Sequence, residues 1–137
     1  MMVKLDIGSG PKDYWYSEDP EWLHLDCEPY EGVIPWTCPS QLPIENNSVD
    51  EVYMGQFLIE LDINQQLALA DELARVMKSD GRILIHDYNG SSGFPEFFER
   101  MEEHGWYRIK EELQNVFEEP DGELIVTYLV ELQKLRR

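Results

Sequence analysis

Basic residues are scarce in this chain. Its 137 residues include 11 Lys and Arg against 28 Asp and Glu, which gives a formal net charge of -17 at pH 7. A field of this sign repels phosphate backbones and anionic membranes, so binding to nucleic acid or to a lipid surface is disfavoured. A solvated acidic surface that keeps the protein soluble is the simplest reading. A basic protein partner or a cationic or neutral small substrate also suits the charge.

Cysteines and long apolar runs are scarce as well. Cys27 and Cys38 are the two cysteines, and they have neither metal-ligand spacing nor the pattern of a disulfide framework, so we predict no metal site. No apolar run approaches the ~20 residues that span a bilayer. No signal peptide is visible, because the amino terminus enters a strand at once. We therefore expect a cytoplasmic protein.

The pattern that is present predicts one α/β domain over residues 1–137, long enough to bury a core. A capping box at Asp62 and Gln65 starts the clearest helix, and Lys78 and Gly81 mark its end. An Asp-Gly pair at 121–122 between two strand-like runs predicts a hairpin. The expected strands are 3–7, 21–26, 33–36, 49–54 and 82–86, with a helical turn at 57–61, helices at 62–78 and 95–104, and hairpin strands at 107–116 and 124–132.

The stretch from Val3 to Lys12 organises this pattern. A short strand runs into Gly8-Ser9-Gly10-Pro11, where the missing Cβ atoms allow a sharp turn and a close approach to a ligand. Asp6 adds a fixed negative charge just before the glycines. A strand that ends in glycines at the carboxyl edge of an open α/β sheet is typical of a ligand site.

A second acid follows at the matching place in the next strand. Asp26 ends that strand, 16 residues after Gly10, where a carboxylate accepts hydrogen bonds from ribose hydroxyls. The alternative is an ordinary turn aspartate before Pro29. Only about ten residues separate the glycines from the second strand, so we expect the usual first helix to be reduced to a turn or two.

Four segments in order resemble the class I S-adenosylmethionine-dependent methyltransferases, in particular the compact set near the methyltransferase-11 and type 12 families. The resemblance runs from Leu5 to about Asp87. It implies a Rossmann-like, doubly wound, mostly parallel sheet with minimal helices, to which the predicted hairpin adds a C-terminal antiparallel pair. The matching segments are Leu5–Lys12, Leu23–Asp26, Leu42–Ile44 with Asn47–Val52, and Arg75–Ile83.

The resemblance also implies where S-adenosylmethionine lies. The cofactor would cross Gly8 to Gly10 with its methionine end near Asp6 and Gln56, and Asp26 would hold the ribose. Thr37 stands where relatives carry an adenine-reading acid, and backbone groups around Cys38 would replace it. The expected cofactor-binding residues are Asp6, Gly8, Ser9, Gly10, Asp26, Cys27, Thr37, Cys38 and Gln56.

No catalytic residue follows from the sequence. The candidates near the transferred methyl group are Gln56, Asp87, Tyr88 and Asn89, each with an alternative as a turn residue. The chain starts two residues before its first strand, without the lid helix that relatives carry. We therefore expect that a homodimer or a partner subunit completes the site, or that the substrate is the surface of a larger partner.

Three functions remain open at this stage. The first is a methyltransferase that acts on an unidentified small molecule or protein acceptor. The second is a catalytically inactive methyltransferase-fold subunit with a binding or regulatory role, which the short first crossover and the residues at Thr37 and Glu60 favour. The third is a nicotinamide-binding domain, which Lys12 and Asp13 weaken because they stand where a third glycine belongs.

Overall fold

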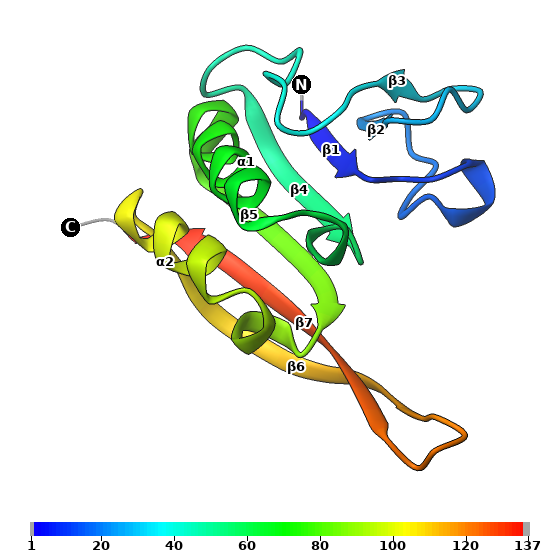
Figure 1. The fold of residues 1–137 in the computed structure, drawn as a ribbon. Helices are drawn as coiled ribbons and strands as arrows, with labels where there is room; N and C mark the ends of the chain where they lie inside the picture. Colours follow the sequence, from blue (N-terminus) through cyan, green and yellow to red (C-terminus); the bar gives the residue numbers. More distant parts are fainter. Residues whose placement is uncertain (1, 136–137) are drawn as a thin grey trace.

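The computed structural model describes residues 2–135, which form a seven-stranded sheet in the order β3-β2-β1-β4-β5-β7-β6 (Figure 1). The strands are β1 (Lys4–Ile7), β2 (Trp22–Asp26), β3 (Ile34–Pro35), β4 (Val49–Gly55), β5 (Met77–Tyr88), β6 (Trp106–Glu118) and β7 (Leu124–Lys134). The α-helices are α1 (Ile63–Val76) and α2 (Pro95–Glu103), and the 3-10 turns are η1 (Lys12–Tyr14), η2 (Leu58–Glu60) and η3 (Gly90–Gly93).

The sheet is doubly wound, as predicted. β1 pairs in parallel with both β2 and β4, so the chain runs outward to β3, returns to β4 and then continues in the opposite direction. β5 is parallel to β4, and β7 is antiparallel to both β5 and β6. The order therefore reverses between β1 and β4, and this is the point where open α/β sheets bind ligands at the carboxyl ends of their strands.

One face of the sheet is apolar and carries both α-helices. Leu5, Val52 and Ile83 lie in register across β1, β4 and β5 and belong to the buried core. α1 and α2 pack against each other on this face, as Figure 1 shows, and contribute buried side chains such as Leu73 and Phe97 to the same core. None of the helices within residues 2–135 has the length and hydropathy needed to cross a bilayer.

The opposite face of the sheet carries a row of charges. Lys4 Nζ lies 3.4 Å from Glu51 Oε2, and Arg82 Nη2 lies 2.7 Å from Glu51 Oε1. Arg82 Nη1 also lies 3.9 Å from a carboxylate oxygen of Glu131, so the row crosses β1, β4, β5 and β7. Glu51 is 6% exposed, and a carboxylate at that depth is stabilised by its paired cations.

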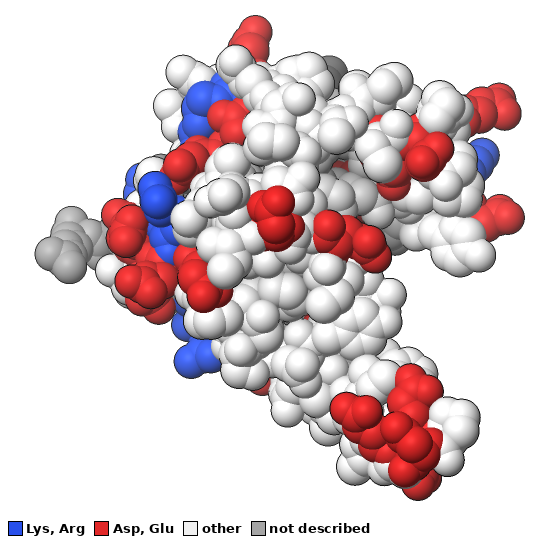
Figure 2. Space-filling model, in the orientation of Figure 1, with Lys and Arg blue, Asp and Glu red and all other residues white. Residues whose placement is uncertain are grey.

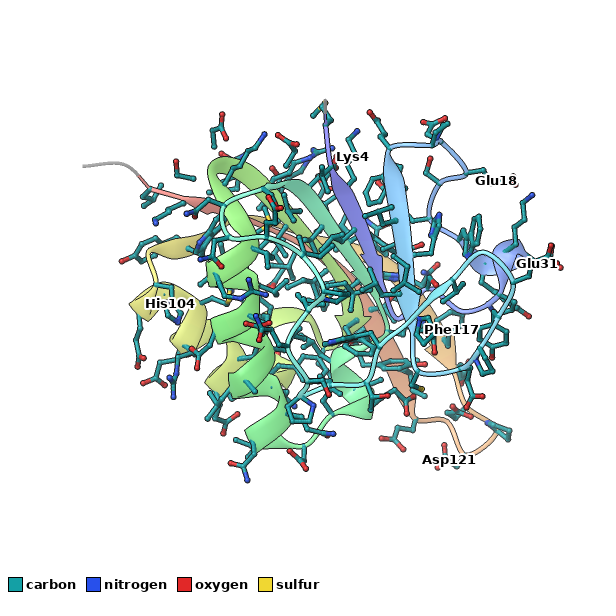
Figure 3. All side chains as sticks on the ribbon, turned by 90° about the horizontal axis from the view of Figure 1, so that it is seen from above. Lys4, Glu18, Glu31, His104, Phe117 and Asp121 are labelled. Carbon is teal, nitrogen blue, oxygen red and sulfur yellow. The ribbon has the colours of Figure 1, made fainter. Side chains whose placement is uncertain are left out.

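The connection from β1 to β2 is as short as predicted. Its only helical part is the three-residue turn η1, and aromatic stacking holds the rest on the polar face. The Trp15 ring stacks on His24 of β2 at 3.6 Å between centroids, and the Tyr16 ring stacks on Tyr53 of β4 at 4.0 Å. Figure 3 shows Glu18 of this connection at the same corner of the molecule as Glu31, which precedes β3.

α1 begins as predicted and ends earlier. Asp62 and Gln65 form the expected capping box. The predicted end at Lys78, with a left-handed glycine cap at Gly81, is wrong, because the chain turns into the extended conformation at Met77 and enters β5 directly. Gly81 instead allows close strand packing, since a Cβ there would lie 2.7 Å from the Asp50 carbonyl oxygen.

Arg75 ties the loop before β4 to α1. Its guanidinium donates to the carbonyl oxygens of Leu42 and Ile44 at 3.0 and 2.9 Å and to Asn46 Oδ1 at 2.8 Å. Glu72 accepts from Arg75 Nε at 2.8 Å and from the Leu42 N–H. Two of the segments that carry the family resemblance are therefore one hydrogen-bonded unit with a structural role.

The C-terminal hairpin is longer than predicted. Tyr88, the last residue of β5, pairs with Thr127, so beyond this point β6 and β7 continue as two strands alone. We call the end of the hairpin, residues 113–126, the arm; it contains this extension and projects from the body of the molecule in Figure 1. The turn at its tip contains Gly122 with φ +87°, in agreement with the predicted Asp-Gly turn.

Candidate functional site

A cavity of about 350 Å³ lies at the carboxyl ends of β1, β2, β4 and β5. Its size falls within the range of small-molecule sites, and it sits at the reversal of strand order. Six of the nine predicted cofactor-binding residues line it. The lining residues are Asp6, Gly8, Ser9, Gly10, Tyr14, Asp26, Tyr53, Gly55, Gln56 and His86.

The glycine turn is bonded to the end of β2. The N–H groups of Gly8 and Ser9 donate to the Leu25 carbonyl oxygen at 2.8 and 3.1 Å, and the Gly10 N–H donates to Asp26 Oδ2 at 2.9 Å. Gly8 and Gly10 have φ of +72° and +67°, the left-handed region that favours glycine. Since all three N–H groups already have acceptors within the protein, the turn offers none to a pyrophosphate.

Asp26 keeps capacity for a ligand. Its Oδ2 accepts from Gly10, and its Oδ1 accepts from the Glu28 N–H at 3.1 Å. A carboxylate has about four acceptor positions, so about two remain for hydroxyl groups. This arrangement fits the predicted ribose contact, and it shows that Asp26 also fixes the conformation of the glycine turn.

Asp6 holds the first crossover. Its Oδ2 accepts from the Tyr16 N–H at 3.0 Å and lies 3.0 Å from His24 Nδ1, and the residue is 2% exposed. Burial raises the pKa of the Asp6 carboxyl, while the hydrogen bonds from Tyr16 and His24 act in the opposite direction. Asp6 therefore contributes its position and charge to the cavity wall, and one of its oxygens serves the fold.

Tyr53 and His86 line the cavity and were not predicted. Tyr53 lies beside Asp6 in register, and His86 lies beside Gly55. A Cβ on Gly55 would lie 2.9 Å from the Tyr53 hydroxyl, so this glycine leaves room for it. Burial raises the pKa of Tyr53 to about 12 and lowers the pKa of His86. Counting the two-residue alternation from Asp6 across the paired strands would have found both.

His86 is oriented by the root of the arm. Its Nε2 lies 3.0 Å from Oγ1 of Thr127, a residue with no exposed surface, and Asn115 Nδ2 donates to the same oxygen at 3.4 Å. A side chain of the cavity wall is thus hydrogen-bonded to Thr127, which pairs with Tyr88 at the end of β5.

The other three predicted cofactor residues do not line the cavity. Cys27 and Thr37 are exposed. Cys38 is buried, and its carbonyl oxygen accepts from Gln65 Nε2 at 3.2 Å, so α1 already uses the backbone group expected to meet adenine. The nearby ring of Phe57 packs on the glycine turn, where a Cβ on Gly8 would lie 2.4 Å from Phe57 Cδ1.

Of the four candidates near the transferred methyl group, only Gln56 lines the cavity. Asp87 is 1% exposed, and its carboxylate accepts from the Ile59 and Tyr88 N–H groups at 3.3 and 2.8 Å, so it holds η2. Asn89 adopts φ +59° at the start of η3. Asn89 fits the turn alternative, and Asp87 is a strand residue whose carboxylate serves the fold.

The charges around the cavity have one sign. Asp6 and Asp26 are among the lining residues, and no Lys or Arg within residues 2–135 is. A site walled by carboxylates favours a cationic ligand and disfavours a phosphate. Within residues 2–135, no group of three or more His, Cys, Asp or Glu side chains is arranged to hold a metal ion.

The lowered pKa of His86 predicts a pH effect on stability. Below about pH 6.5 the unfolded chain takes up a proton at this residue while the folded protein resists it, so stability falls as the pH drops through this range. We expect His86→Gln to lose less melting temperature than the wild type between about pH 7.5 and about pH 5.5. Equal losses in thermal unfolding scans would contradict the assignment.

No protein-family model matches the sequence, and no curated protein matches it. Solved structures do match. A TehB-like SAM-dependent methyltransferase from Corynebacterium glutamicum aligns with a TM-score of 0.60 at 18% identity, covering 98% of this chain and 80% of that one. A 1,6-didemethyltoxoflavin-N1-methyltransferase from Burkholderia thailandensis, solved with S-adenosylhomocysteine, gives 0.69 at 14% identity over 98% and 71%.

A geranyl diphosphate C-methyltransferase from Streptomyces coelicolor, also solved with S-adenosylhomocysteine, gives 0.66 at 11% identity over 98% and 71% of the two chains. At sequence identities this low, the structural similarity establishes the fold and nothing further. The chain has the fold of the S-adenosylmethionine-dependent methyltransferases, as its four sequence segments implied. The last two of these proteins are named for different methyl acceptors, geranyl diphosphate and 1,6-didemethyltoxoflavin, so the fold leaves the acceptor of this chain open.

Proposed function

We propose that this protein is an S-adenosylmethionine-dependent methyltransferase. The observation that carries the proposal is the hydrogen bond between the glycine turn and Asp26 at the point of reversed strand order. The cavity there has two carboxylates in its lining and, among the residues that the structure describes, no Lys or Arg. S-adenosylmethionine supplies a methyl group on a positively charged sulfonium, which needs alignment more than acid–base help.

The residues present fit this cofactor in three respects. Asp26 has acceptor positions left for ribose hydroxyls. Asp6 provides negative charge at the wall next to the glycine turn, which suits a cation. Gln56, Tyr53 and His86 bring polar side chains to the ends of β4 and β5, where they can orient bound groups.

The same geometry weakens the nicotinamide alternative. A dinucleotide places its pyrophosphate on free backbone N–H groups at a helix N-terminus. Here the turn's N–H groups are bonded to Leu25 and Asp26, and the glycines lead into a three-residue 3-10 turn in place of a helix.

Calorimetric titration tests the proposal. We expect heat of binding for S-adenosylmethionine and none for NAD at the same millimolar concentration. NAD carries a pyrophosphate that needs free backbone N–H donors, and S-adenosylmethionine carries none. Heat of binding for NAD and none for S-adenosylmethionine would reverse the assignment.

A non-catalytic binding subunit is the second candidate. Two observations favour it. Asp87 and Asn89 have structural roles at η2 and η3, and of the four candidates near the transferred methyl group Gln56 alone lines the cavity. The two candidates differ in one result. Both bind S-adenosylmethionine, and only the enzyme converts it to S-adenosylhomocysteine when an acceptor is added, which chromatography of the nucleosides detects.

A further inference from the structure

The arm exposes apolar side chains on both of its faces. Along β6 and β7 the register places Leu113 and Val116 on the face that carries the α-helices and Phe117 on the opposite one. Half or more of each of these side chains is exposed. The values are 54% for Leu113, 52% for Val116, 50% for Phe117 and 62% for Leu124. We call these four residues the arm surface.

An apolar surface on a free two-stranded hairpin points to a partner. A hairpin without a third strand or a helix layer is at best marginally stable in water, and exposed apolar patches of this kind mark sites of association. The register of β6 shifts between Arg108 and Lys110 and again between Leu113 and Asn115. Bulges at such positions protect an edge strand from backbone pairing, so the side-chain faces are the part available for contact.

The charge on the arm is of one sign. From Glu111 to Gln133 the chain contains no Lys, Arg or His. Four carboxylates stand at the tip, and Figure 2 shows red side chains gathered at the end of the projection. Figure 3 places Phe117 and Asp121 on the arm, across the molecule from His104 at the end of α2. The tip carboxylates are Glu118, Glu119, Asp121 and Glu123.

We infer that the arm is a docking element for a basic, amphipathic segment of another protein. The segment's apolar side chains cover the arm surface, and its Lys and Arg side chains meet the tip carboxylates. A second copy of this chain is the poorer occupant, because two bodies of net charge -17 repel and would bring acidic tips and acidic surfaces together.

The root of the arm joins this surface to the cavity. Asn115 and Thr127 lie where the arm leaves the sheet, and Thr127 is bonded to His86 of the cavity wall. Figure 1 shows the arm extending past the end of β5, so a segment docked on it lies on the side of the molecule where the cavity opens. Resting on the proposed function, this makes the methyl acceptor a group carried by the docked segment rather than a free small molecule.

Fluorescence anisotropy with labelled 18-residue peptides tests the docking. The probes are an alternating Leu-Lys peptide, a Leu-Glu peptide and a Ser-Lys peptide. We expect the wild type to bind Leu-Lys at least tenfold more tightly than Ser-Lys and not to bind Leu-Glu. Equal affinity for Leu-Lys and Ser-Lys, or binding of Leu-Glu, would overturn the proposal.

Two sets of substitutions locate the binding on the arm. The triple variant Leu113→Ser, Phe117→Ser and Leu124→Ser should lose at least tenfold in affinity for Leu-Lys. The variant Glu118→Gln, Glu119→Gln, Asp121→Asn and Glu123→Gln should lose affinity and most of its salt dependence. The matched control neutralises four exposed carboxylates of α2, at Glu96, Glu99, Glu102 and Glu103, and should bind as the wild type does. A control as weak as the arm variants would refute docking on the arm.

Hydrogen exchange gives a readout on the unmodified chain. Added Leu-Lys peptide should protect amides of residues 113–126 and leave α2 unchanged, and protection confined to α2 would contradict the inference. Light scattering tests whether a second copy of this chain occupies the arm instead. If the wild type is a dimer and the triple variant is a monomer, the occupant is a second copy and the docked-segment proposal is wrong. Titration of the wild type with S-adenosylmethionine keeps the two proposals apart. Peptide binding without cofactor binding would overturn the proposed function, and with it the acceptor assignment, and would leave the docking on the arm in place.

Discussion

Asp26→Ala should reduce S-adenosylmethionine binding by about 100-fold or more. The side chain offers two remaining acceptor positions, and a hydrogen bond to a charged acceptor contributes about 1.5–3 kcal/mol. Two such bonds correspond to at least about 3 kcal/mol, and every 1.4 kcal/mol is a factor of ten. The substitution also releases the Gly10 N–H, so the turn loses the anchor that fixes it. Calorimetric titration measures the affinity.

Glu28→Gln is the matched control. Glu28 is exposed, and the substitution leaves intact the hydrogen bond that its backbone N–H donates to Asp26 Oδ1. This variant should bind the cofactor within about twofold of the wild type, since the Glu28 side chain is exposed to solvent and does not line the cavity. Melting temperatures of both variants separate a lost contact from a disordered turn. Unchanged affinity in a folded Asp26→Ala protein would mean that Asp26 is only a turn residue.

Gly8→Ala should destabilise the fold by about 3 kcal/mol. A left-handed backbone costs a residue with a Cβ about 1–2 kcal/mol, and overpacking adds about 1–3 kcal/mol. The clash is direct, because the added Cβ would lie 2.4 Å from Phe57 Cδ1. For a domain of this size the loss lowers the melting temperature by roughly 10 °C, which thermal unfolding followed by circular dichroism will measure.

Gly10→Ala separates the two causes. Its φ of +67° is similar, and the nearest atom to an added Cβ is Tyr14 Cβ at 3.6 Å, an ordinary contact. This variant should lose only the backbone part, about 1–2 kcal/mol. In the Gly8→Ala background, Phe57→Ala should recover part of the loss by removing the clash. Equal losses at Gly8 and Gly10 would show that the packing of Phe57 on the turn does not matter.

The fold could be predicted largely from local patterns. Glycines after β1, an acid ending β2, a capping box at Asp62 and an Asp-Gly turn each act over a few residues, and each lies where it was expected. The end of α1 was wrong for a physical reason. Lys78 and Gly81 have the local pattern of a helix end. Residues from Met77 onward instead pair with β4 as part of β5, and this long-range pairing ends the helix earlier.

The site was predicted only where position along a strand decides it. Asp6, Asp26, Gln56 and the glycines reach the cavity because strand ends meet at one edge. The sequence does not show which polar groups are already hydrogen-bonded to residues far away along the chain. The Cys38 carbonyl is taken by Gln65, and the Asp87 carboxylate by η2, through contacts between residues 27 or 28 positions apart. Tyr53 and His86 enter the cavity through strand register.

The row of charges across Lys4, Glu51, Arg82 and Glu131 limits what can cover that face of the sheet. An apolar helix laid over it would remove water from Arg82, whose side chain is 47% exposed, and dehydrating an ion of this kind costs several kcal/mol. The two faces of the sheet therefore differ in kind, one apolar and covered by the helices and the other lined by paired charges. We propose that a partner that completes the site approaches from the rim of the sheet, along the carboxyl ends and the arm.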